Sequence, residues 1–459
     1  MSSYAVTNPV TGDLLVSYPG ITDSDLADAI ARADAATRGW GRRSTVAERA
    51  ALVRAVGDLH SERRDELGRA LVAEMGKPLA QALGEIDFAA DIYRYYAEAS
   101  PAELADQPIE LLAGTGTAVI RSAPLGVILG IMPWNFPFYQ VARFAAPNIV
   151  VGNSVLLKPA PQCPHTAELI QAMYADAGVP DGAYQAILAS NEQISAVIAD
   201  PRVQGVSLTG SERAGSAVAE QAGRHLKKVV LELGGSDPFI VLSADDLDAV
   251  VADLVAGRLD NSGQSCNAPK RAIVVSDLHA AFTEKLVAAL SGVAPSDPLA
   301  DDAELGPVSS LVAAERLEGQ VRRAAEAGAS ILLGGTRDGA FFAPTVITGI
   351  PRDSAIYREE MFGPVALVYE VADEAEAIEV ANDTPYGLGS YVYTTDAEQG
   401  ERVANAIDAG MVFVNCVLAD GVELPFGGVK RSGFGREMGR LGATEFANRK
   451  LIRTVAPGA

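Results

Sequence analysis

The feature of this sequence that most constrains its fold is the alternation, from Gly126 onward, of short β-rich runs with helical stretches. The runs GVILGI, SVLLK, VQGVSLTG and KKVVLEL are separated by helical stretches such as HTAELIQAMYADAG and SERAGSAVAEQAG. After the GGSDP turn at 234–238 the alternation restarts with FIVLS and RAIVVS and continues to MVFVN at 411–415. Because parallel neighbouring strands need a crossover that is usually helical, the pattern predicts an α/β fold with two doubly wound units.

Other segments flank or interrupt these units. Residues 24–99 place apolar residues at three- and four-residue spacing and are predicted to be helical. The segment PIELLAGTGTAVIRSAP, before the first strand, and the tail after PFGGVKRSGFG are β-like extensions that fit neither unit. Such extensions usually need a second chain to cover them, which indicates an oligomer, although pairing as two strands within one chain fits the pattern equally well.

Composition limits the partners that this chain can have. It has 459 residues and a formal net charge of −22, so its surface repels phosphate backbones and anionic lipids. We expect no nucleic acid and no membrane, and a small-molecule partner, although solubility alone is the commoner reason for an acidic surface. No signal peptide or membrane span is apparent. Three cysteines cannot form a disulfide framework, so the cytoplasm is the expected compartment.

Several kinds of active site have no support in the sequence. No GxSxG elbow, GKS or GKT phosphate loop, or HExxH pair occurs, and the four histidines are isolated from acidic clusters. No hydrolase triad and no metal site are therefore expected. GFGREMG at 433–439 is the nearest approach to a dinucleotide fingerprint, but its spacing is wrong and no strand precedes it, so a loop is predicted.

Cys266 lies in NSGQSCN, among glycine and polar residues, shortly after the predicted helix DLDAVVADLVAGRLD. A cysteine becomes nucleophilic where it is partly exposed and its thiolate is favoured, whereas structural cysteines lie within apolar runs. The surroundings of Cys266 suit a nucleophile, and an inert turn cysteine is the alternative. Cys163 and Cys416 have no comparable neighbours.

Two further residues occupy positions suited to catalysis. Glu232 ends the run KKVVLEL, and the carboxyl end of a buried strand is where open α/β sheets bind ligands, so burial would raise its pKa toward that of a general base. Asn135 lies between prolines in IMPWNFPFYQ, a stiff loop that could hold an amide donor against a developing oxyanion. The alternatives are a glutamate bonded to the next turn and an asparagine that caps the helix near Tyr139.

Two sites could bind phosphate. Lys158 ends the run SVLLK and precedes Pro159, so its ammonium group could bind phosphate or ribose oxygens at the edge of the sheet. Thr209, Gly210 and Ser211 form a turn of small residues between a strand and a helix, whose N-terminus attracts anions. Each of these signals is weak alone.

Taken together, the motifs PWNFP, KPA, LTGS, ELGG, GQSC, EEMFGPV and PFGGVKRSG stand in the order and spacing of the aldehyde dehydrogenase superfamily, which the sequence resembles over essentially its whole length. Within it, WNFPFYQVARFAAP, KKVVLELGGSDPFIV and NSGQSC are most similar to the succinate-semialdehyde dehydrogenases. The resemblance implies an aldehyde dehydrogenase-like fold of two doubly wound α/β domains plus a β-strand oligomerisation arm. The dinucleotide-binding domain would span 1–105 and 124–233, the catalytic domain 234–425, and the arm 106–123 and 436–459, in a homodimer or homotetramer.

The resemblance also implies a role for each candidate residue. Cys266 would attack the aldehyde carbonyl, and the Asn135 amide and the Cys266 backbone N–H would hold the oxyanion. Hydride would then leave for the nicotinamide, and Glu232 would activate the water that hydrolyses the thioester. The residues expected at the cofactor are Trp134, Asn135, Lys158, Pro161, Gly210, Ser211, Leu233, Glu360 and Phe362.

Two positions bear on specificity. Pro161 stands three residues after Lys158, where many NAD-preferring members carry a glutamate that binds the adenosine ribose and repels a 2′-phosphate. Its absence favours NADP, with NAD as the alternative cofactor. Arg143 stands where some succinate-semialdehyde enzymes place an arginine that grips the distal carboxylate of the substrate; the alternative is a helix arginine paired with a surface acid.

Two departures concern the turn around the nucleophile. The second arginine expected just before it is out of register, because Asp260 occupies that position and Arg258 lies two residues earlier. Asn267 and Ala268 follow Cys266, where some redox-switched members carry a second cysteine, so no local disulfide switch is expected.

The sequence therefore predicts an NAD(P)-dependent enzyme that oxidises succinate semialdehyde to succinate through a thiohemiacetal and a thioester. Another small aldehyde, such as glutarate semialdehyde or an amino-aldehyde, is the alternative substrate. Acyl transfer to coenzyme A is disfavoured because Glu232 is present to activate water for hydrolysis of the thioester. A catalytically silent dinucleotide-binding scaffold is disfavoured by the intact Cys266 and Glu232.

Overall fold

The computed structural model describes residues 4–457 of the chain. An N-terminal hairpin, which the sequence did not predict, precedes the expected helices. Thr22 and Thr45 cap the first two of these helices, and Thr45 forms a reciprocal capping box with Glu48. The elements are β1 (Tyr4–Thr7), β2 (Leu14–Tyr18), α1 (Asp23–Ala36), a π-helical turn (Thr37–Gly41), α2 (Val46–Glu62), α3 (Arg64–Met75) and α4 (Leu79–Glu103).

The first sheet has six strands in the order β19-β9-β8-β5-β6-β7, parallel except for β19. Its strands are β5 (Val127–Ile131), β6 (Ser154–Lys158), β7 (Tyr184–Ala186), β8 (Val203–Thr209), β9 (Lys228–Glu232) and β19 (Gly433–Phe434). The connecting helices are α5 (Pro137–Val151), α6 (Pro164–Asp176), α7 (Asn191–Ala199) and α8 (Glu212–Arg224). Four of the six strands coincide with predicted runs, whereas β7 and β19 are too short to give a pattern.

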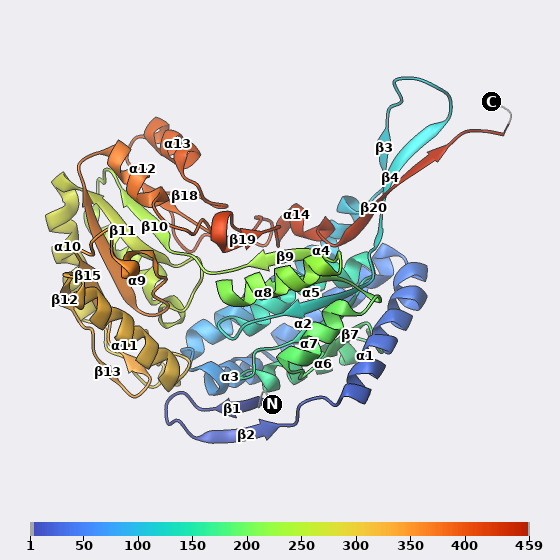
Figure 1. Cartoon of the computed structure of the whole chain (residues 1–459), viewed down its shortest axis with the longest axis horizontal. Coiled ribbons are helices and arrows are strands. Elements are labelled where there is room, and N and C mark those ends of the chain that lie inside the picture. Colours follow the sequence, from blue (N-terminus) through green and yellow to red (C-terminus); the bar gives the residue numbers. More distant parts are fainter. Residues whose placement is uncertain (1–3, 458–459) are drawn as a thin grey trace.

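The second sheet has seven strands in the order β12-β15-β16-β11-β10-β17-β18, and only β12 is antiparallel to its neighbour. It lies at the left of the molecule in Figure 1, and the first sheet lies at the centre. The strands are β10 (Asp237–Val241), β11 (Pro269–Val275), β12 (Ser330–Leu333), β15 (Thr345–Thr348), β16 (Val365–Val371), β17 (Tyr391–Tyr393) and β18 (Phe413–Val414). The helices are α9 (Leu247–Leu259), α10 (Ser276–Ser291), α11 (Leu311–Glu326), α12 (Glu374–Asn382) and α13 (Ala397–Ala406).

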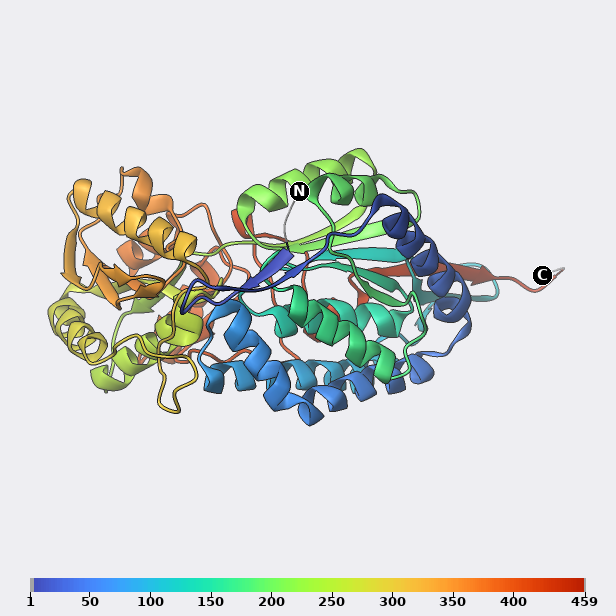
Figure 2. The ribbon, with the colours of Figure 1, turned by 90° about the horizontal axis from the view of Figure 1, so that it is seen from below.

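Short elements connect these larger ones. They are the hairpin of β13 (Arg337–Asp338) and β14 (Phe341–Phe342) and the 3-10 turns Asp260–Gly263, Ala355–Arg358 and Lys430–Ser432. Figure 2 shows the two α/β units as separate lobes. The predicted α/β class with two doubly wound units is confirmed.

A three-stranded sheet projects from the body of the molecule, at the upper right of Figure 1. It consists of β3 (Gln107–Ile109), β4 (Thr117–Pro124) and β20 (Ala447–Thr454), all antiparallel. The two β-like extensions of the sequence therefore pair with each other within one chain. The first part of the expected 436–459 segment does not project: α14 (Gly439–Thr444) packs against α4 and α5, because its small residues allow close approach to these helices.

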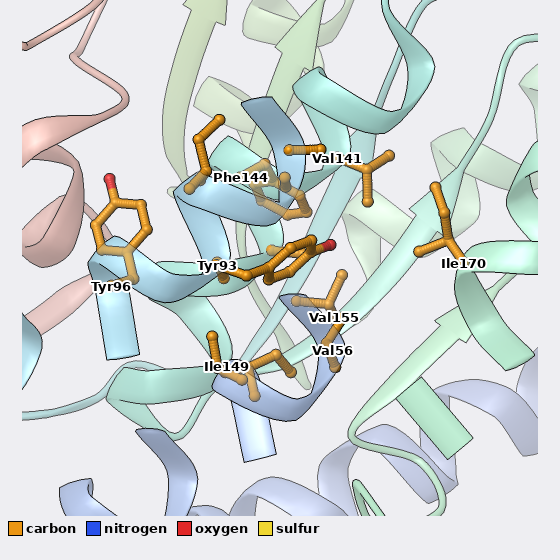
Figure 3. Packing of buried hydrophobic residues seen from close by; sticks show 14 of the residues in the cluster. Val56, Tyr93, Tyr96, Val141, Phe144, Ile149, Val155 and Ile170 are labelled. Atoms are coloured by element: carbon orange, nitrogen blue, oxygen red, sulfur yellow. The ribbon is translucent and has the colours of Figure 1, made fainter. Parts of the chain in front are cut away.

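Each face of the first sheet carries its own core. Residues of β5 alternate between the two, since Ile128 joins the cluster under α2, α4, α5 and α6 while Val127 and Leu129 join the cluster under α1, α7 and α8. Figure 3 shows how side chains from α2, α4, α5, α6 and β6 converge in the larger cluster. Burial of each large apolar side chain stabilises the fold by roughly 1.5–3 kcal/mol. This packing fixes α5, and with it the loop before α5, against the sheet.

Among residues 4–457, no helix combines the length and the apolar character that a membrane span requires.

Candidate active site

A cavity of about 820 Å³ lies at the carboxyl ends of β5, β8 and β9, facing residues of the second unit. Ligand sites of open α/β sheets are expected there, because parallel strands bring their carboxyl ends to one edge. The residues singled out from the sequence that line the cavity are Trp134, Asn135, Thr209, Gly210, Ser211, Glu232, Leu233, Cys266, Glu360 and Phe362.

Cys266 reaches the cavity from a tight turn in the second unit. Asn261, Ser262 and Gly263 all have positive φ values, of 51°, 53° and 74°, which reverses the chain directly after α9. The buried Arg258 donates to the Gly263 and Pro269 carbonyl oxygens and so ties the turn to the first residue of β11. In the sequence, Arg258 lies two residues before the position where a substrate-binding arginine was expected. In the structure, its contacts are with the backbone of the turn and of β11.

The thiol of Cys266 is half-buried and lines the cavity. Burial raises its pKa to about 12, while the positive charges of Arg143 and Lys270 lower it and the carboxylates of Glu360 and Asp237 raise it. In the free protein the thiol is therefore protonated near neutral pH. The thiol is partly exposed, as expected for a nucleophile, and apolar residues of the larger core also pack against it.

The Asn135 side chain is held on both sides. Its Nδ2 donates to the Gln264 carbonyl oxygen at 3.0 Å, and its Oδ1 accepts from Gln140 Nε2 at 3.0 Å. The Asn135 carbonyl oxygen accepts from Asn261 Nδ2 at 2.8 Å. These bonds point the amide group toward the turn of Cys266. Asn135 does not cap α5, which instead is capped by the carboxylate of Glu85 on the Phe138 and Tyr139 N–H groups.

Glu232 ends β9 and lies almost entirely buried at the cavity wall. Within residues 4–457, neither of its carboxylate oxygens has a hydrogen-bond partner, so it does not bond the next turn. Burial raises its pKa well above the usual value, and the neighbouring Arg143 opposes that shift. A carboxylate that is buried and unpaired is a strong proton acceptor for water in the cavity.

Arg143 is not among the residues that line the cavity, and its role in substrate binding stays a prediction. Its guanidinium group is buried, with Nε at 2.5 Å from Glu437 Oε2, Nη1 at 3.1 Å from the Tyr139 hydroxyl and Nη2 at 3.2 Å from Thr209 Oγ1. It also lies over the Phe426 ring. All three nitrogens are thus engaged by the protein. Its charge acts instead on the pKa values of Cys266 and Glu232.

The residues expected at a dinucleotide fit such a ligand. Gly210 and Ser211 lead into α8, where Ser211 caps the helix, and helix N-termini bind phosphate. The rings of Trp134 and Phe362 meet edge to face at 5.8 Å and form an apolar wall. Glu360 presents a carboxylate that could accept from ribose hydroxyl groups.

Two of the predicted cofactor residues lie outside the cavity wall. Lys158 ends β6 beside β5, buried, with its ammonium nitrogen 5.8 Å from the centre of the Tyr4 ring. Burial lowers the pKa of Lys158. Pro161 is exposed, and its carbonyl oxygen accepts from the Ala5 N–H at 3.0 Å. Their neighbour Gln162 does line the cavity.

Sequence reasoning missed several functional positions. Gln140 donates to Asn135 and orients it, Lys270 donates to the Cys266 carbonyl oxygen, and Glu437 forms an ion pair with Arg143. A polar Gln140 in the apolar helix FYQVARFAAP was a detectable signal, whereas no local signal marked Glu437, which lies 294 residues from Arg143. The cavity residues from α11 and beside it are Ser309, Ser310, Val312, Ala313, Arg316, Leu317 and Gln320.

No group of three His, Cys, Asp or Glu side chains within residues 4–457 could hold a metal ion. The three cysteines are unpaired. His60 is fully buried, and that burial lowers its pKa to about 4.

A doubly wound α/β chain that brings a cysteine, an amide and a buried carboxylate to one cavity has the features of a cysteine-dependent, dinucleotide-linked oxidoreductase. The chain belongs to the aldehyde dehydrogenase family, whose profile matches residues 1–452. It is 50% identical over 453 residues to a succinate-semialdehyde dehydrogenase [NADP(+)] of Deinococcus radiodurans, covering 98% of this chain and 94% of the relative. It is 44% identical to succinate-semialdehyde dehydrogenase [NADP(+)] 1 of Mycobacterium ulcerans, covering 98% and 99% of the two chains.

A solved structure agrees with these relatives. The succinic semialdehyde dehydrogenase of Streptococcus pyogenes, in complex with NADP+ as the cofactor, superposes with a TM-score of 0.95. It is 40% identical, and the match covers 98% of this chain and 99% of that one. The predicted family and its enzyme class, an NAD(P)-dependent aldehyde dehydrogenase, are confirmed.

Proposed function

We propose that this enzyme oxidises succinate semialdehyde to succinate with NADP+ as the cofactor. The observation that carries the proposal is the convergence of Cys266, Asn135 and Glu232 at one cavity. The names of the relatives at 44–50% identity support the substrate and the cofactor.

The chemistry begins at Cys266. Its thiolate sulfur bonds to the aldehyde carbon, and the carbonyl π electrons move to the oxygen. The second N–H of the Asn135 amide and the backbone N–H of Cys266 are the donors for this oxyanion, since the first N–H of Asn135 is held by Gln264. The nicotinamide cofactor, when bound, supplies the acceptor for the hydride that leaves the same carbon. The carbon then remains attached to sulfur as a thioester.

Glu232 serves the second half of the reaction. Its carboxylate takes a proton from water, the water oxygen bonds to the thioester carbon, and the carbon–sulfur bond breaks to release the carboxylate and the Cys266 thiolate. In total one aldehyde, one oxidised cofactor and one water yield one carboxylate, one reduced cofactor and two protons. Because burial raises the pKa of Glu232, the residue must lose its proton before it can act.

The choice of NADP+ rests on position 161. Pro161 is exposed and carries no charge that would repel a 2′-phosphate, and Lys158 provides a positive charge on the same segment.

One observation favours the alternative of another small aldehyde. Arg143, the expected ligand of the distal carboxylate, already donates one N–H from each of its three nitrogens, to Glu437, Tyr139 and Thr209. An uncharged aldehyde or an amino-aldehyde would not require this contact.

The test is a comparison of kcat/KM for succinate semialdehyde, glutarate semialdehyde, an amino-aldehyde and an uncharged aldehyde of equal length, each with NADP+ and NAD+. We expect succinate semialdehyde with NADP+ to exceed the other combinations by about tenfold or more, which corresponds to about 1.4 kcal/mol. Cys266→Ala is the inactive control. A higher kcat/KM for the uncharged aldehyde would overturn the substrate assignment.

We also propose that the enzyme is a cytoplasmic homodimer or homotetramer. The projecting sheet of β3, β4 and β20 supports the assembly because it exposes the apolar side chains of Ile109 and Leu451, together with Leu112 in the loop after β3 and Val455 directly after β20. Three unpaired cysteines are consistent with a reducing compartment.

A further inference from the structure

Lys270 is a buried lysine at the start of β11, and its ammonium group lies between the turn that carries Cys266 and the carboxylate of Glu360. Its Nζ donates to the Ser265 carbonyl oxygen at 2.9 Å and to the Cys266 carbonyl oxygen at 2.6 Å. The same nitrogen lies 3.2 Å from Glu360 Oε1. One side chain therefore contacts both the turn of the nucleophile and the carboxylate expected at the cofactor.

The contact with Ser265 bears directly on the oxyanion. The peptide group between Ser265 and Cys266 contains the Ser265 carbonyl oxygen and the Cys266 N–H, and it is planar. A bond from Lys270 to that oxygen fixes the direction in which the Cys266 N–H points. An ammonium group at the oxygen also polarises the peptide and strengthens its N–H as a donor. The second bond fixes the following peptide, so both peptides flanking the Cys266 Cα are held.

The contact with Glu360 bears on the cofactor. Glu360 Oε1 also accepts from the Gly235 N–H at 3.2 Å, so this oxygen is held from two sides. Oε2 lies against Gly234, where a Cβ would collide with it. The carboxylate is thereby kept in one orientation at the cavity wall, with its charge partly compensated by Lys270.

We infer that Lys270 is a positioning residue that couples the oxyanion donor of Cys266 to the ribose carboxylate of Glu360. The inference rests on the proposed function for the roles of these two groups. It predicts that loss of Lys270 weakens cofactor binding and slows chemistry together, although Lys270 is not among the residues that line the cavity.

The pH at which the Cys266 thiol ionises can distinguish this role from a purely structural one, because it depends on the positive charge of Lys270. The charged groups around the Cys266 thiol are Arg143 and Lys270, which favour the thiolate, and Glu360 and Asp237, which oppose it. The phenols of Tyr139 and Tyr391 also face it. Removal of Lys270 leaves two carboxylates against one guanidinium, so the thiol should ionise at higher pH.

The experiment compares Lys270→Met, which removes the donors and the charge, with Lys270→Gln, which keeps an amide donor, and Lys270→Arg, which keeps the charge. Lys227→Met is the matched control, because Lys227 also donates to two backbone carbonyl oxygens, those of Asp200 and Val203 at 2.9 and 2.6 Å, but at the amino end of β8, whereas the cavity lies at its carboxyl end. Thermal unfolding identifies any variant that fails to fold, and only the folded variants are compared in the two measurements below.

Two measurements need no aldehyde: the Kd for NADPH and the pH dependence of Cys266 alkylation by iodoacetamide. For Lys270→Met we expect the Kd to rise and the alkylation rate at pH 7 to fall by about tenfold each, and kcat to fall by at least as much. Lys270→Arg should restore the alkylation profile, Lys270→Gln should not, and Lys227→Met should match the wild type.

Unchanged NADPH binding and an unchanged alkylation profile in folded Lys270→Met or Lys270→Gln protein would overturn the inference. The Kd for NADPH and the alkylation profile are both measured without aldehyde. The test of Lys270 can therefore be interpreted even if the proposed substrate is wrong.

Discussion

Cys266 combines the proposed role of nucleophile with a half-buried position, and burial raises the pKa of its thiol to about 12, which has a measurable consequence. Only the thiolate reacts with iodoacetamide, and below the pKa its fraction rises about tenfold for each pH unit. We expect the alkylation rate of Cys266 in the free enzyme to rise continuously from pH 6 to pH 9. A plateau at or below pH 8 would contradict this expectation, and Cys266→Ala protein gives the background rate.

At the same scale, the sequence singled out the three proposed reacting groups, which the structure brings to one cavity, but not the residues that hold them in place. Cys266, Asn135 and Glu232 each follow a strand end or occupy a distinctive turn, so their position in the fold follows from local pattern. Arg143 and Glu437 are 294 residues apart, and a pairing between distant positions leaves no local signal. The burial that raises the pKa of Cys266 likewise depends on packing, which the motif NSGQSCN does not contain.

At the scale of elements, the N-terminus of α5 depends on a buried ion pair. Glu85 of α4 accepts from the Phe138 and Tyr139 N–H groups at 2.9 and 3.2 Å and pairs with Lys77. The Lys77 ammonium lies 3.6 Å from the centre of the Phe136 ring. This arrangement holds the loop that carries Asn135.

Glu85→Ala should therefore destabilise the enzyme by about 3–5 kcal/mol, because it leaves a buried ammonium group and two backbone N–H groups without partners. Glu85→Gln should cost less, since it keeps an acceptor. The measurement is urea unfolding. Glu98→Ala is the control on the same helix: the Arg54–Glu98 pair is 44% and 66% exposed, so its loss should cost at most about 1 kcal/mol. Equal losses for Glu85→Ala and Glu98→Ala would contradict this account.

The elements themselves were predictable in proportion to their length and periodicity. Runs such as SVLLK and KKVVLEL correspond to β6 and β9. The three-residue strand β7 and the antiparallel strand β12 were missed, because short or exposed strands show neither alternation nor a buried apolar run. The partner of β4 was undetermined, since strand pairing over more than 300 residues depends on tertiary structure.

At the scale of the whole molecule, the projecting sheet of β3, β4 and β20 should mediate assembly. Leu451 of β20 is 62% exposed, and an apolar side chain on a projecting strand indicates an interface. We expect light scattering to give a mass that is a multiple of 47.8 kDa for the wild type and a smaller multiple for Leu451→Asp.

The control for that prediction is Leu226→Asp. Leu226 is 94% exposed on the body of the molecule and has a positive φ of 53°, which aspartate tolerates. This variant should keep the mass of the wild type. A wild-type mass of 47.8 kDa at micromolar concentration would show that the sheet does not assemble copies of the chain.

The most direct test of the catalytic arrangement uses Glu232→Gln protein mixed with succinate semialdehyde and NADP+, followed by absorbance and by intact-protein and peptide mass spectrometry. If Cys266 carries the acyl group and Glu232 activates water, the variant should form one NADPH per chain and then stop, with a succinyl group on Cys266. Sustained turnover at the wild-type rate, or one NADPH per chain with no adduct on Cys266, would contradict the account.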